Sequence, residues 1–101
     1  MHIPQAGAIL DWGALEPRFT ALLREDLTPE RVPDWLARWS DLQKIVWETR
    51  AGLKRDRLRD LTDEAAGRAW GRFVEEVFAP FQVANGALTT KLLAVPGYAP
   101  A

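Results

Sequence analysis

Apolar residues in this chain recur at three- and four-residue steps over three separate stretches, the spacing expected for one face of an α-helix. The longest stretch begins near Pro29 or Val32 and ends near Leu58. Its apolar stripe consists of Val32, Trp35, Trp39, Leu42, Val46, Thr49 and Leu53. Because the steps alternate between three and four over three heptads, the pattern predicts a long helix packed along its length against another helix.

A second long helix is predicted from about Leu61 to Leu93. Thr62 is expected to cap its N-terminus. Pro80 predicts a kink near Glu76–Val77, because proline has no N–H to donate to the preceding turn. The apolar face of this helix consists of Ala66, Trp70, Phe73, Val77, Phe81, Ala84 and Leu88.

A shorter helix is predicted over roughly Glu16 to Glu25, after a first turn that Asp11 can cap. Pro17 fits the first turn of this helix, and Asp26 or Thr28 is available to cap the helix that follows. The apolar face of the short helix consists of Leu15, Phe19, Leu22 and Leu23.

No stretch alternates apolar and polar residues in the way a strand would. We therefore predict an all-α fold, in which a long antiparallel helical hairpin carries a shorter N-terminal helix. The 101 residues form a single helical domain, with an irregular lead-in over 1–10 and a frayed tail over 95–101.

The charge pattern argues against nucleic acid or an anionic membrane as a partner. Net charge is −1, and lysine and arginine are interspersed with aspartate and glutamate. Cysteine is absent, which fits a reducing compartment. The N-terminus lacks the layout of a signal peptide, and no apolar run approaches the roughly 20 residues that span a bilayer. We expect a soluble, cytoplasmic protein.

Side chains for catalysis or metal binding are scarce. His2 is the only histidine, whereas a peptidase zinc site normally takes two imidazoles and a carboxylate. Glu75 and Glu76 are adjacent and point about 100° apart on a helix, so they cannot face each other across a substrate. A carboxylate di-metal enzyme would need acidic groups facing inward, but the stripes are apolar. We assign no catalytic, cofactor-binding or metal-binding residue.

The basic run at Lys54, Arg55, Arg57 and Arg59 could hold phosphate, but Asp56 and Asp60 interrupt it. It indicates a charged helix end.

Several aromatic and aliphatic residues remain for a contact with a partner. Trp35, Trp39 and Trp70 could form an aromatic cage, although their spacing favours core packing. Trp47 lies off the stripe and is the better candidate for an exposed contact. The residues predicted to mediate self-association or a domain contact lie beside the two stripes: Leu36, Ile45, Trp47, Val74 and Phe78. They widen the apolar face beyond the needs of a two-helix contact, which predicts a homodimer.

Three groups of residues also occur in a distinctive order. They are Asp11–Phe19 with Leu22–Arg24, then Trp35–Leu42, and then Thr62–Ala66, Phe73–Pro80 and Lys91–Ala94. In order and spacing they resemble the N-terminal helical region of the oligoendopeptidase branch of the thimet-oligopeptidase family of zinc metallopeptidases. The resemblance covers about residues 11–94.

This resemblance implies an all-helical N-terminal segment of a cytosolic hydrolase, forming part of the wall of a channel that admits short peptides. The family's His-Glu-x-x-His motif and zinc ligands lie downstream, in sequence this chain does not contain, so zinc is expected only in a full-length parent. The chain departs from the family at Lys54–Asp60, where the family is more apolar. The expected partner is the missing catalytic domain or a second copy. The alternative is an independent helical-hairpin interaction module or adaptor.

Overall fold

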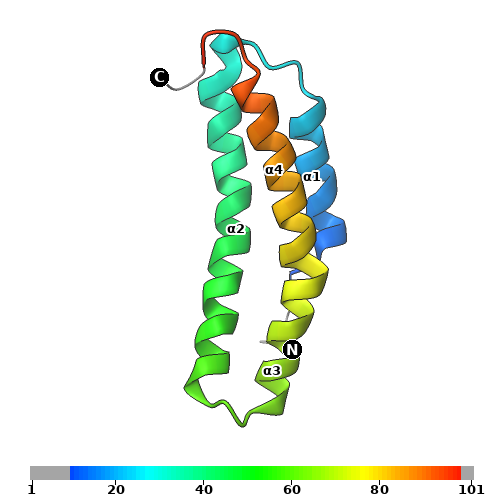
Figure 1. The fold of residues 1–101 in the computed structure, drawn as a ribbon, viewed down its shortest axis with the longest axis vertical. Coiled ribbons are helices and arrows are strands. Elements are labelled where there is room, and N and C mark those ends of the chain that lie inside the picture. The colour runs from blue at the N-terminus through cyan, green and yellow to red at the C-terminus, as the bar shows by residue number, and fades with distance from the viewer. Residues whose placement is uncertain (1–9, 99–101) are drawn as a thin grey trace, which may run out of the picture.

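In the computed structural model, which describes residues 10–98, the chain folds into an all-α helical hairpin with a shorter helix packed on it (Figure 1). The predicted fold class is confirmed. The elements in chain order are α1 (Trp12–Arg24), the 3₁₀ turn η1 (Pro29–Arg31), α2 (Val32–Arg59), α3 (Glu64–Phe73), the π-helical turn η2 (Val74–Phe78) and α4 (Ala79–Leu93).

The two predicted apolar stripes meet inside the hairpin. On α2 the five stripe residues from Val32 to Val46 are buried, while Thr49 and Leu53, closer to the hairpin turn, are half-buried. The opposing helix buries Phe73, Val77, Phe81 and Leu88. The spacing of apolar residues therefore identified both sides of the core, because each stripe can leave water only by facing the other.

Helix α1 covers only part of the hairpin. It runs beside α4 in the half of the molecule remote from the turn at residues 60–63 (Figure 1). Three of its predicted apolar residues are buried, namely Leu15, Phe19 and Leu22, whereas Leu23 is 42% exposed. The Phe19 ring packs edge-on against Phe81 of α4, with centroids 5.8 Å apart. Near the turn the fold therefore consists of two helices, and the molecule is elongated, with extents of 51 × 32 × 18 Å.

The helix irregularity predicted at Pro80 takes the form of the π-helical turn η2. Pro80 has no N–H to donate to the Glu76 carbonyl, four residues back. The Ala79 N–H donates to the Val74 carbonyl, five residues back, which is the bond of a π-helix rather than of an α-helix. The α2 stripe makes six steps of three or four residues between Val32 and Leu53. The apolar face of the second long helix makes the same number of steps between Ala66 and Leu88, a span that is one residue longer. A π-turn absorbs one extra residue, so it keeps Phe73 and Phe81 in one core.

The N-terminal caps were predicted correctly for α1 and wrongly for α3. Asp11 caps α1, because its Oδ1 accepts the Gly13 N–H at 3.0 Å. Thr62 does not cap α3. Its hydroxyl donates to Asp60 Oδ1 at 2.7 Å, and Asp63 accepts the Ala66 N–H at 3.1 Å instead. Thr62 is already engaged in the tight turn, so the next acidic residue takes the capping position.

Three smaller expectations also need correction. Helix α1 begins at Trp12, so Pro17 lies inside it rather than in its first turn. Thr28 precedes η1 but makes no side-chain capping bond. After α4 the chain does not fray over 95–98: Val95 is buried, and Gly97 adopts a φ of 79° that permits a turn onto the core.

Candidate functional site

The five residues predicted to contact a partner do not form one surface. Leu36, Ile45, Val74 and Phe78 are half-buried and pack against the core, while Trp47 is 44% exposed. The rings of Trp47 and Phe78 meet with centroids 5.2 Å apart. Ile45, however, precedes Trp47 by two positions and so lies about 200° away around α2. The structure therefore brings Trp47 and Phe78 together and separates them from Ile45.

The outer face of α4 carries apolar surface that the sequence analysis did not single out. No charged residue occurs from Val77 to Thr90, although the polar residues Gln82, Thr89 and Thr90 are also exposed on α4. Val83 is 76% exposed and Leu93 is 49% exposed. The other exposed residues of α4 are uncharged, and exposed apolar side chains such as Val83 and Leu93 are typical of a surface that contacts other protein. The outer face of α4 is thus a candidate surface for contact with another protein segment.

A groove of about 370 Å³ runs between this face and α1. Its walls are mainly apolar, and Glu16 is the charged residue in its lining. The principal apolar residues along it are Trp12, Phe19, Leu23, Pro80 and Val83. In the sequence, the groove is indicated by the absence of charged residues from Val77 to Thr90. The spacing of apolar residues does not indicate it, because that spacing identifies only the stripe that faces the core.

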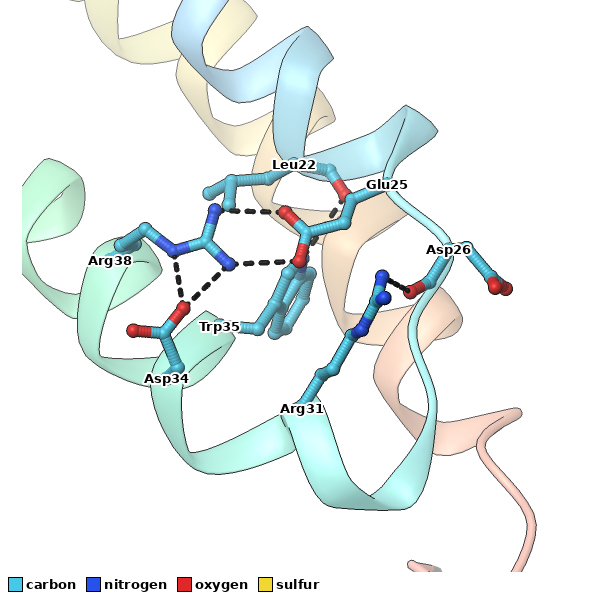
Figure 2. A network of polar contacts seen from close by, with 7 residues as sticks. All are labelled: Leu22, Glu25, Asp26, Arg31, Asp34, Trp35 and Arg38. Atoms are coloured by element: carbon cyan, nitrogen blue, oxygen red, sulfur yellow. Dashed lines mark hydrogen bonds and ion pairs between the residues drawn. The ribbon is translucent and has the colours of Figure 1, made fainter.

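A polar network fixes α1, and with it one wall of the groove, to α2 (Figure 2). The buried indole of Trp35 donates its N–H to the Leu22 carbonyl at 3.0 Å. The Arg38 guanidinium donates two parallel bonds to the Glu25 carboxylate, each of 2.8 Å, and a third to Asp34 at 2.9 Å. The bonds close the last turn of α1 onto the start of α2.

The same contacts set the ionisation of this pair. The hydrogen bonds from Arg38 hold the pKa of Glu25 below its ordinary value of 4.5. The carboxylates of Glu25 and then Asp34 in turn raise the pKa of Arg38. Both groups therefore stay charged through the neutral range, and the arrangement serves as a fixed structural ion pair rather than a source of protons.

The remaining polar candidates lie on the surface. Glu75 and Glu76 are exposed, and Glu76 pairs with Arg72 at 3.4 Å. In the basic run, Arg59 pairs with Asp56, and Arg57 donates to the Leu61 carbonyl at 2.7 Å. These contacts agree with the interpretation of this run as a charged helix end.

The tryptophans that could have formed a cage divide into two groups. Trp35 and Trp39 are buried in the core, as their spacing predicted, while Trp70 is half-buried.

Across residues 10–98, no group of three or more histidine, cysteine, aspartate or glutamate side chains is arranged to hold a metal ion. His2 lies outside these residues. No helix in the described part of the chain combines the length and the apolar character needed to cross a lipid bilayer.

No family model, no curated protein and no solved structure matches this chain at a significant level.

Proposed function

We propose that this chain is a non-catalytic helical domain of a zinc oligopeptidase, the N-terminal part that helps to wall the substrate channel. The resemblance over residues 11–94 supports this proposal. The all-helical fold is also the one that the resemblance implies.

The observation that carries the proposal is the uncharged outer face of α4. From Val77 to Thr90 it offers no charge to water, and Val83 stands 76% exposed at its middle. By contrast, α2 carries charged, exposed residues such as Asp34, Asp41 and Glu48 on its outer side. This asymmetry suits a domain whose α4 side lies against further protein and whose α2 side faces solvent.

The chain's own residues do not fit a peptidase zinc ion. The sequence has one histidine and no cysteine, and the described residues bring no set of ligands together. Under the proposal, zinc and the hydrolytic chemistry belong to the catalytic domain of a cytoplasmic parent. This chain contributes shape and apolar contact area.

In the absence of that domain, the same surface is proposed to pair two copies of the chain. A symmetric dimer places one patch against its own counterpart, and the outer face of α4 has no charge between Val77 and Thr90 that would repel its copy. We therefore propose a homodimer for the isolated chain, with the α1–α4 groove and the outer face of α4 as its contact.

The proposal is tested by the DNA that follows the codon for Ala101. An in-frame continuation that encodes His-Glu-x-x-His supports it. A stop codon followed by an unrelated gene contradicts it. A biochemical counterpart mixes this chain with the separately expressed continuation, and under the proposal the two form a complex that cleaves short peptides.

The second candidate is an independent helical-hairpin interaction module. Contacts within the chain favour this candidate, because they stabilise the hairpin without a further domain. They include the Arg38–Glu25 ion pair and the hydrogen bond from Trp39 to Asn85. An interaction module should bind a separate partner through the α4 face without any continuation of the reading frame.

A further inference from the structure

Three aromatic rings lie around the guanidinium of Arg50, in the half of α2 nearer the hairpin turn. Its Cζ atom is 5.6 Å from the ring centroid of Trp47, 5.6 Å from that of Trp70 and 5.2 Å from that of Phe78. The rings come from α2, α3 and η2, so the fold assembles them from separate elements. Among residues 10–98, no carboxylate forms an ion pair with Arg50. Ring faces are therefore its principal partners.

Three ring centroids lie 5.2 to 5.6 Å from the one cationic carbon of Arg50. A ring face attracts any cation placed over it, and quaternary ammonium groups are the ligands that such sets of aromatic rings recognise in proteins. The three rings therefore suit a compact cation that takes the place of the guanidinium.

The walls of this site are held in place by the core rather than by Arg50. The Phe78 ring contacts the buried rings of Phe73 and Phe81, with centroids 6.0 and 5.8 Å away. Trp70 stacks on Phe73 at 6.2 Å, and Trp47 meets Phe81 edge-on at 5.9 Å. The three rings are therefore held by contacts with core residues as well as by those with Arg50. Trp47 is 44% exposed, so the site opens to solvent.

We propose that Trp47, Trp70 and Phe78 form a binding site for a quaternary ammonium cation, and that Arg50 is an internal occupant that the ligand displaces. This inference does not depend on the proposed peptidase-domain function. Because Arg50 competes from within the chain, its removal strengthens binding. The shared chemistry fits two sources, a free choline-like cation and a trimethylated lysine side chain.

The test is a titration with tetramethylammonium chloride at constant ionic strength, followed by tryptophan fluorescence. We expect saturable binding by the wild type and at least tenfold tighter binding by Arg50→Ala. Adding Trp70→Leu to Arg50→Ala should abolish the response. The uncharged isostere of choline, 3,3-dimethylbutan-1-ol, should give no saturable response where choline does, because it lacks the charge that the rings attract.

The proposal is overturned if folded Arg50→Ala shows no saturable response. It is also overturned if the alcohol binds as tightly as the cation, or if the wild type and Arg50→Ala bind equally. Circular dichroism establishes that each variant is folded, and Arg50→Gln replaces Arg50→Ala if the latter loses its helical signal. Parallel titrations with choline and with Nε-trimethyllysine then distinguish the two sources, since the tighter ligand identifies the class.

Discussion

The indole N–H of Trp39 on α2 donates to the side-chain carbonyl of Asn85 on α4 across 2.7 Å. Asn85 in turn donates its amide to Gln43 at 3.4 Å. Only 7% of Trp39 is exposed, so its donor has little access to water if Asn85 is lost. Two apolar stripes could still pack if one helix shifted along the other. The hydrogen bond between Trp39 and Asn85 can form at only one alignment of the two helices. It therefore fixes how α2 and α4 align.

Replacing Asn85 by leucine should destabilise the protein by about 1 to 3 kcal/mol, because a buried donor then remains without an acceptor. Asn85→Asp keeps an acceptor for Trp39 and should cost less. Urea unfolding followed by circular dichroism measures both. Gln82→Leu, at an exposed position on the same helix, is the matched control. Equal stabilities for Asn85→Leu and this control would contradict the structural role of the bond.

The Glu25–Arg38 pair predicts a pH-dependent contribution to stability. The folded-state pKa of Glu25 lies below its ordinary value of 4.5, so its contribution is fully present above that pH. The contribution disappears as the pH falls through the lower folded-state pKa, where the carboxylate becomes protonated in both states. The wild type should therefore be more stable than Glu25→Gln at pH 7, and the difference should shrink towards pH 3.

Thermal unfolding at a series of pH values measures this difference. A gap between wild type and Glu25→Gln that stays constant down to pH 3 would show that the carboxylate charge plays no part. Glu30→Gln, an exposed acidic position in η1, supplies the control for general charge effects.

The cap of α3 distinguishes two neighbouring residues. Asp63→Ala removes the acceptor for the Ala66 N–H and should cost about 1 kcal/mol. Thr62→Ala removes a hydroxyl bond within the turn and should cost less. Urea unfolding of the two variants checks the order. If Thr62→Ala proves the more damaging change, Thr62 rather than Asp63 stabilises the start of the helix.

Spacing of apolar residues was sufficient to predict the hairpin, since Trp35 and Val46 on one helix and Phe73 and Phe81 on the other lie in the core as expected. The π-turn was harder to predict. Pro80 signals an irregularity, but proline is compatible with either a bend or an inserted residue. The cap at Asp63 was missed because Thr62 satisfies the same preference and is diverted by Asp60, a local competition that residue type does not resolve.

The structure separates the residues predicted to contact a partner, and it exposes apolar surface that the spacing of apolar residues did not indicate. Leu36 and Ile45 lie beside the α2 stripe, but the packed helices themselves cover much of their area. Val83 lies outside the apolar stripe of its helix, so the three- and four-residue spacing does not indicate it. The position of Arg50 among three rings depends on how three elements meet, which the sequence does not state.

A single charge should disrupt the proposed dimer contact. Val83→Lys places an ammonium in the uncharged outer face of α4, and burying it without a partner is costly. We expect at least a tenfold loss in dimer affinity with unchanged helical content, measured by sedimentation equilibrium. Ser40→Lys adds the same residue at an exposed site on α2 and should leave the affinity unaltered. An equally tight dimer for Val83→Lys would place the contact elsewhere, with the surface around Trp47 the next to test.

The central claim is that the apolar surface of α4 and the adjoining groove require a protein partner. Light scattering coupled to size-exclusion chromatography tests it most directly, on the chain alone at tens of micromolar. We predict a mass twice that of the 11.4 kDa chain. A monomer of 11.4 kDa throughout that range would contradict the account.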